Sequence, residues 1–117
     1  MIEADELCDR LVELGTYLDG DPERVQEYNT IKLWVLYLWC STLYYHDDCS
    51  PVLDQTYDRI CRELHGRDDS VLQRRPWFAP RLFDREALKA GSGFHIQRND
   101  PPIKVQRAAH EYLTRSP

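Results

Sequence analysis

The sequence predicts a small, mostly α-helical fold made of a single domain. The chain has 117 residues, which is the usual size of one domain. Leucines recur at helical spacing near its start, and aspartate, proline and glycine stand where helices typically begin and end. Hydrophobic residues make up 42% and aromatic residues 11% of the chain, so it has the side chains for a core that a disordered chain would lack.

Two helices are expected in the first 47 residues. The segment 2–18 is amphipathic and ends near Gly20, with its apolar face formed by Leu7, Leu11, Leu14 and Leu18. Asp21, followed by a proline and a glutamate, is a typical start for a second helix that fades around residues 44–47. Its run 33–40 is apolar on all sides, which predicts the central buried helix. A buried strand is the competing interpretation, because periodicity does not separate the two over eight residues.

The remaining chain predicts shorter elements. Asp54 is placed to cap a third helix that ends at Gly66. Residues 67–83 are expected to form an irregular aromatic loop, in which Trp77 and Phe78 either anchor the loop on the helices or form an exposed patch for a partner. The C-terminal segment 84–117 is expected to be helical, with a cap at Asp84, a flexible hinge at Gly91-Ser92-Gly93 and a last helix after Pro101-Pro102.

Charge and composition exclude several classes of function. The formal net charge is −5, and the densest basic cluster, near Arg74 and Arg75, is interrupted farther along by Asp84 and Glu86, so nucleic-acid binding is not expected. The longest apolar run, of eight residues, is too short to span a membrane. The acidic N-terminus lacks the features of a secretory signal. We therefore expect a cytoplasmic protein whose four cysteines are reduced.

The segment 44–64 carries the clearest chemical signal. Two tyrosines precede a short polar loop, Asp54 starts the next helix, and Tyr57 and Asp58 lie in its first turn. Such a corner offers aromatic faces for stacking a flat ring, and carboxylates for the donors or positive charge of that ring. A pyridinium ring attached to a ribose suits this set.

This segment resembles the N-terminal Ia domain of NAD-dependent DNA ligases. The matching residues, with no gap between them, are Tyr44, Asp54, Tyr57, Asp58, Glu63 and Leu64. The resemblance implies a core at about residues 21–66 with two antiparallel helices joined by the loop. It also implies recognition of the nicotinamide mononucleotide (NMN) half of NAD, with the tyrosines stacked on the nicotinamide and the aspartates holding the ring amide and the ribose.

The sequence departs from the ligase pattern in two ways. The family has a histidine where this chain has Tyr45, and His46 follows one position later. One residue turns a helical side chain by about 100°, so either Tyr45 or His46 could stand in for that histidine, and both are included in the candidate set. No lysine is followed by x-Asp-Gly, the adenylation motif of ligases. Catalytic residues are therefore not expected, and no cofactor is expected to be required.

A second constellation could bind zinc. Its four potential ligands are His46, Cys49, Cys61 and His65. Two of them lie in the loop and two lie one helical turn apart, which approximates a four-ligand zinc site. The simpler interpretation is that they are ordinary core and surface residues.

The chain resembles the small stand-alone ligase-Ia-like proteins of bacteriophages, and this leads to three functional hypotheses. The first is a non-catalytic accessory protein that binds a host protein of DNA metabolism or defence. The second is a module that senses or sequesters NMN or NAD. The third, an enzyme that acts on such a nucleotide, is the least favoured, because no acid–base or nucleophile constellation accompanies the site. Exposure of Tyr44, Asp54 and Asp58 around one cavity would favour the second hypothesis, whereas burial of both Tyr44 and Tyr57 without a cavity would favour the first.

Overall fold

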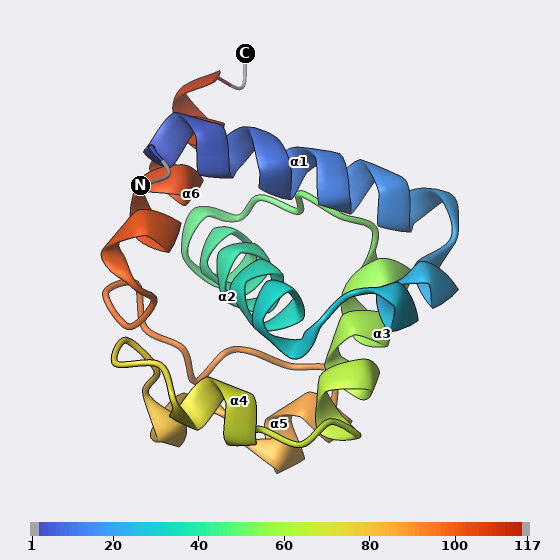
Figure 1. The fold of residues 1–117 in the computed structure, drawn as a ribbon. Coiled ribbons are helices and arrows are strands. Elements are labelled where there is room, and N and C mark those ends of the chain that lie inside the picture. The colour runs from blue at the N-terminus through green and yellow to red at the C-terminus, as the bar shows by residue number, and fades with distance from the viewer. Residues whose placement is uncertain (1–2, 116–117) are drawn as a thin grey trace.

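One helix, α2 (Thr30–Asp47), passes through the middle of the molecule, and the other helices surround it (Figure 1). The computed structural model describes residues 3–115, and over that range it contains helices and no strand. In chain order the elements are α1 (Ala4–Gly20), η1 (Pro22–Glu27), α2, α3 (Asp54–His65), α4 (Ser70–Gln73), η2 (Pro80–Leu82), α5 (Arg85–Lys89) and α6 (Ile103–Arg115), where η marks a 3-10 helix. The prediction of a small, mostly α-helical domain is confirmed.

Helix α2 is buried along most of its length, as its apolar run predicts. Its buried side chains include Trp34, Tyr37 and Trp39, none of which is more than 1% exposed. The interpretation of this run as a strand is wrong. A helix that is apolar on all sides must be covered on all sides, and the ring of surrounding elements provides that cover (Figure 1).

The expected second helix is in fact two elements. Asp21 does accept a hydrogen bond from the Glu23 N–H at 3.2 Å, but the helix that it caps is the short 3-10 helix η1. Tyr28 and Asn29 are extended, and the Asn29 side chain accepts from the Lys32 N–H at 2.8 Å, which starts α2. The apolar spacing of Val25, Tyr28 and Ile31 continues across this break, so it was not predicted, although asparagine is a common N-cap residue.

Helices α1 and α6 pack against each other, so the two ends of the chain meet on one side of the molecule (Figure 1). Helix α1 continues to Gly20, two residues beyond the expected amphipathic segment, while Ile2 lies outside the described residues. Gly15 is buried where the loop before α3 crosses α1, and a Cβ at this position would lie 2.9 Å from Val52 Cγ1. The absence of a side chain at Gly15 thus lets the loop lie close to α1.

Helix α3 begins one residue earlier than a cap at Asp54 would place it. Leu53 occupies the N-cap position and makes no side-chain cap, while Asp54 is the first helical residue. Asp54 therefore favours the helix through the dipole of the first turn. Gly66 follows the last helical residue, as expected. Figure 1 shows α2 almost end-on and α3 from the side, so the two helices cross, whereas the ligase resemblance implied an antiparallel pair.

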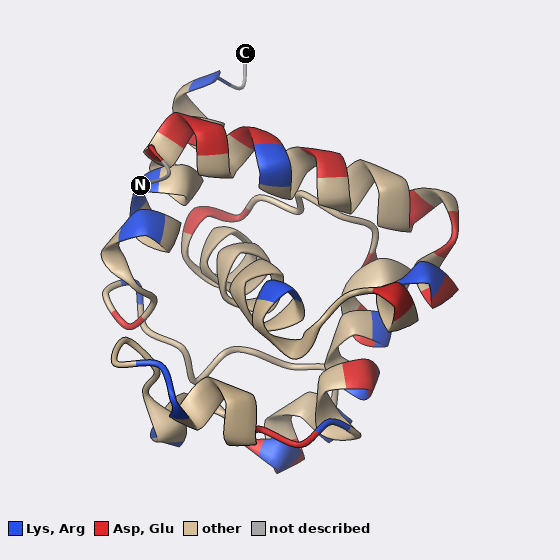
Figure 2. Ribbon diagram, viewed as in Figure 1, with Lys and Arg blue, Asp and Glu red and all other residues tan. Residues whose placement is uncertain are grey.

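The segment 67–83 is more regular than expected, since it contains α4 and η2. Phe78 and Phe83 are both buried, and their rings lie 5.7 and 5.3 Å from the Trp34 ring. These contacts anchor the segment on α2. Most charged residues lie on the outer helices, and those of α2 lie near its two ends (Figure 2). Among the described residues no helix has the length and apolar character needed to cross a membrane.

Candidate functional site

A cavity of about 150 Å³ opens at the corner between the end of α2, the loop before α3 and the first turn of α3. We call it the corner cavity. The residues that line it are Cys40, Tyr44, Tyr45, Ser50, Pro51, Val52, Asp54, Tyr57, Asp58 and Gly91. Five of the six binding residues proposed from the sequence thus meet in one place, although they come from two helices and are up to 14 positions apart.

Tyrosine rings form one wall of the corner cavity. The rings of Tyr44 and Tyr57 are stacked, with centroids 6.4 Å apart and planes inclined by 21°. Tyr44 is 47% exposed, whereas the Tyr57 hydroxyl is paired with Ser41 Oγ at 2.7 Å. Burial raises the pKa of Tyr57, so its hydroxyl stays protonated. The wall therefore has an accessible outer ring and a fixed inner ring.

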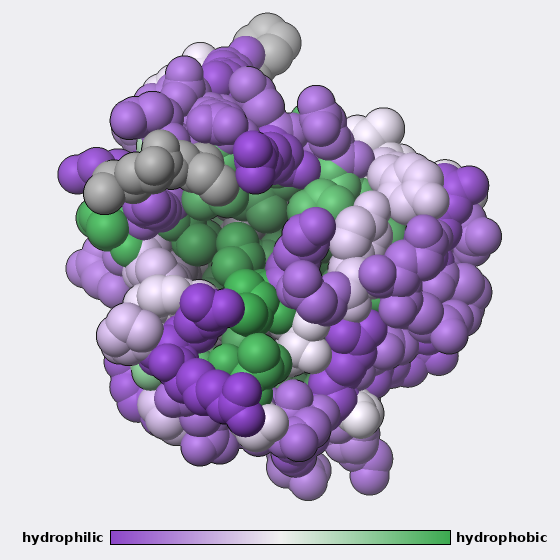
Figure 3. Space-filling model, in the orientation of Figure 1, coloured by the Kyte–Doolittle hydropathy of each residue, from purple (hydrophilic) through white to green (hydrophobic). Residues whose placement is uncertain are grey.

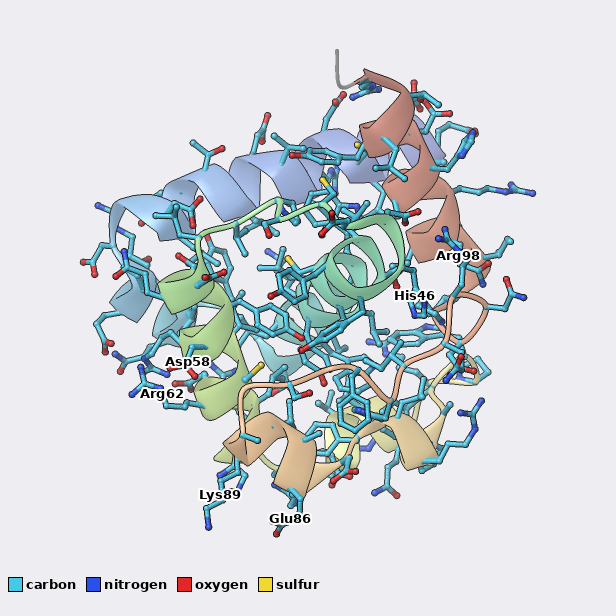
Figure 4. All side chains as sticks on the ribbon, turned by 180° about the vertical axis from the view of Figure 1, so that it is seen from behind. His46, Asp58, Arg62, Glu86, Lys89 and Arg98 are labelled. Carbon is cyan, nitrogen blue, oxygen red and sulfur yellow. The ribbon has the colours of Figure 1, made fainter. Side chains whose placement is uncertain are left out.

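Two carboxylates provide the negative charge of the corner cavity. Asp54 and Asp58 are both exposed, and they lie one helical turn apart on α3. One oxygen of Asp58, Oδ2, lies 3.2 Å from Arg62 Nε, and Figure 4 shows these two side chains next to each other on α3. The other oxygen, Oδ1, faces Gly91, because a Cβ on that glycine would lie 2.8 Å from it.

Gly91, in the turn 91–93, lines the other side of the corner cavity, a role that was not predicted from the sequence. Gly91 has a φ of +70°, which a glycine adopts without strain. A Cβ on Gly93 would overlap Ser41 Oγ and the Tyr57 hydroxyl. The Tyr37 hydroxyl donates to the Ser92 carbonyl at 2.8 Å. The two glycines were interpreted as a hinge, but these contacts hold the turn against α2 and α3.

His46 lies outside the corner cavity, so its inclusion in the binding set is corrected. Its Nε2 is paired with the Ile96 carbonyl at 2.7 Å, and its own carbonyl accepts from Arg98 at 2.9 Å. Figure 4 shows His46 and Arg98 well away from Asp58. Tyr45, by contrast, lines the cavity. Of these two residues, only Tyr45 is in a position to contact a molecule in the corner cavity.

The four-ligand zinc site proposed from the sequence is not assembled. Over residues 3–115 no group of three or more His, Cys, Asp and Glu side chains is placed to hold a metal ion. Cys61 is fully buried on the inner face of α3, and burial raises the pKa of its thiol to about 12. The spacing of these residues along the chain therefore does not bring them together around one point.

These observations define what the corner cavity can do. It combines an accessible aromatic face, two carboxylates and a glycine turn. Comparison of the chain with known protein families, curated proteins and solved structures finds no match. The resemblance to the ligase Ia domain thus rests on the residues of the segment 44–64 alone.

Proposed function

We propose that this protein binds the nicotinamide end of NMN or NAD in the corner cavity and does not transform it. The observation that carries this proposal is the convergence of Tyr44, Asp54, Tyr57 and Asp58 on one open cavity. Exposure of Tyr44 and of both aspartates is the arrangement that the nicotinamide hypothesis requires.

The size of the corner cavity suits one ring. Pockets for drug-sized ligands measure roughly 300–1,000 Å³, and this cavity measures about 150 Å³. A nicotinamide ring would occupy it, and the ribose and phosphate would lie over its open side. A whole dinucleotide would leave its adenylate half in solvent, so NMN and NAD are expected to bind with similar affinity.

The chemistry of the walls favours a cationic ring. The oxidised nicotinamide ring is a flat pyridinium, which stacks on tyrosine faces and is attracted to their π electrons. The carboxylates of Asp54 and Asp58 add Coulomb attraction and accept hydrogen bonds from the carboxamide and the ribose hydroxyls. The reduced ring of NADH has no positive charge, so it should bind more weakly than NAD.

Calorimetric titration with NMN, NAD, NADH and AMP tests the proposal. We expect heat with NMN and NAD, less with NADH and none with AMP. Tyr44→Ala and Asp58→Asn should each weaken NMN binding, because the first removes the stacking face and the second removes a charge. Phe94→Ala is the matched control, since Phe94 is 69% exposed and lies outside the cavity lining.

Two results would overturn the proposal. One is the absence of heat with NMN at millimolar concentration. The other is unchanged affinity in both cavity variants, which would place the nucleotide elsewhere. The accessory role with a host protein stays a prediction, and it concerns a surface other than this cavity.

A further inference from the structure

An apolar groove runs across the face of the molecule that is turned to the viewer in Figures 1 and 3. It is visible in Figure 3 as a hollowed hydrophobic band between hydrophilic borders. Two adjoining cavities of about 540 and 460 Å³ form it, and both are lined by Leu7 and Val35. The other apolar and aromatic lining residues are Leu11, Leu14, Tyr17, Tyr28, Ile31, Trp77, Pro102, Ile103 and Val105.

The groove leaves large hydrophobic side chains in contact with solvent. Tyr17, Trp77 and Ile103 are all exposed. The most exposed of them is Ile103, the first residue of α6, at 58%. Soluble monomers seldom expose connected apolar patches of this kind unless the patch binds something. Most of the lining residues belong to helices α1, α2 and α6, and the others, Tyr28, Trp77 and Pro102, belong to connecting segments, so the groove offers no strand edge for an added strand.

The charge around the groove is opposite to that of the whole chain. Its lining includes three cations, Arg10, Lys32 and Lys104, and one anion, Glu13, whereas the formal net charge of the chain is −5. Among the described residues Lys32 and Lys104 form no ion pair with an acidic group. Figure 2 shows basic residues at the near end of α2 and on α6, whereas α1 carries mainly acidic residues and its Arg10 pairs with Glu6 at 3.1 Å.

We propose that the groove receives an amphipathic helix of a partner protein that carries acidic residues along the borders of its apolar face. The aliphatic side chains at the bottom of the groove can pack against leucines at positions i, i+3, i+4 and i+7 of the partner helix, as in other helix-in-groove complexes. The ammonium groups of Lys32, which lies 5.9 Å from the centre of the Tyr28 ring, and of Lys104 suit the acidic borders. A second copy of this chain is disfavoured, because a two-fold interface would bring the same cations together from both sides.

Two synthetic peptides that differ only in charge test this inference. Each is a fluorescein-labelled amphipathic helix of about four turns, with leucines along one stripe and either glutamate or lysine on its borders. Fluorescence anisotropy should show that the wild-type protein binds the acidic peptide and not the basic one. The acidic peptide is repelled by the net charge of the protein, so its binding identifies a local basic site.

Three variants locate the binding site. The double variant Lys32→Glu with Lys104→Glu should weaken binding of the acidic peptide by about tenfold or more and should bind the basic peptide instead. Ile103→Glu should abolish binding of the acidic peptide, because it places a charge in the groove. Phe94→Glu, an equally exposed position away from the groove, should leave binding unchanged. Circular dichroism confirms that each variant is folded.

Three outcomes would overturn the inference. The first is equal binding of both peptides by the wild-type protein, and the second is unchanged peptide preference in the double variant. The third is a dimer in sedimentation experiments that becomes a monomer in the Ile103→Glu variant, since a second copy would then be the occupant. Titration with NMN is independent of all three, so the groove and the corner cavity are tested separately.

Discussion

Two features of Gly91 require a glycine. Its φ is +70°, and its Cα lies close to the Asp58 carboxylate of the corner cavity. Gly91→Ala introduces a methyl group 2.8 Å from Asp58 Oδ1 in a conformation that L residues rarely adopt. We expect the free energy of unfolding to fall by about 1–3 kcal/mol and NMN binding to weaken, because Asp58 must move. Urea denaturation and calorimetry measure the two effects.

Gly66→Ala is the control for that substitution. Gly66 follows α3 with a φ of −85°, and its nearest neighbour would lie 3.7 Å from an added Cβ. It should change stability little. Equal losses in the two variants would show that the effect at Gly91 is a general cost of replacing glycine, unrelated to Asp58.

Single residues also show where the sequence could not decide. The spacing of Tyr44, Asp54, Tyr57 and Asp58 predicted side chains on one corner, and all four line the corner cavity. Whether Tyr45 or His46 lines the corner cavity depends on the direction of each side chain. The hydrogen bond between His46 and the Ile96 carbonyl turns the His46 side chain away from the cavity. That hydrogen bond joins residues 50 positions apart, so no local pattern could reveal it.

Helix α3 is tied to its neighbours by a row of charges centred on Glu63. The two oxygens of Glu63 lie 3.0 Å from Arg59 and 2.8 Å from Arg67, and Arg59 also reaches Glu23 of η1 at 3.0 Å. Burial alone would raise the pKa of Glu63, but the hydrogen bonds from the two arginines outweigh it and lower the pKa. Glu63 is therefore more acidic in the folded than in the unfolded protein.

This shift predicts how stability depends on pH. A carboxylate whose pKa is lowered by folding stabilises the protein above its unfolded pKa, about 4.3, and loses that effect as the pH falls through the folded pKa. Glu63→Gln should cost about 1–2 kcal/mol at pH 7. Thermal denaturation at several pH values should show wild type and variant converging below about pH 4.

Glu6→Gln is the comparison for this element. Glu6 pairs with Arg10 at 3.1 Å on the outer face of α1, where both side chains are more than half exposed. Such a pair contributes little, so the variant should match the wild type at every pH. A gap between Glu63→Gln and the wild type that persists at pH 3 would contradict the role given to the carboxylate charge.

Elements were predictable where local signals agree and were missed where they compete. The apolar run in α2, the cap at Asp84 and the stop at Gly66 are each local, and each holds in the structure. The break at Tyr28 and Asn29 was missed because the apolar spacing continues across it. The cap of α3 was misplaced by one residue because the Leu53 N–H is held by Asp19 of α1 at 3.1 Å, a contact between segments distant in the chain.

The reactivity of the four cysteine thiols reports on the packing of the whole molecule. Cys8, Cys40 and Cys61 are buried on three different helices, whereas Cys49 is half-buried in the loop after α2. Burial raises the pKa of each thiol, and only the thiolate reacts rapidly. In the folded protein one thiol should react with Ellman's reagent, and the other three should react only as the whole domain unfolds.

The variant Cys49→Ser distinguishes the accessible thiol from the others. This variant should lose the rapid phase of the reaction with Ellman's reagent and keep the three slowly reacting thiols. The rate at which these three thiols react should rise with urea concentration in parallel with the rate of global unfolding. Rapid reaction of a second thiol in this variant would show that α1, α2 or α3 opens independently of the rest of the domain.

The central position of α2 has a consequence for synthesis on the ribosome. This helix ends at residue 47, but its cover is completed by α6, which ends at residue 115. At about 5–20 residues per second, roughly 3–14 seconds pass between the two. During that interval Trp39 lacks its edge-on contact with the Tyr112 ring of α6, so the core is completed only after this helix has left the exit tunnel.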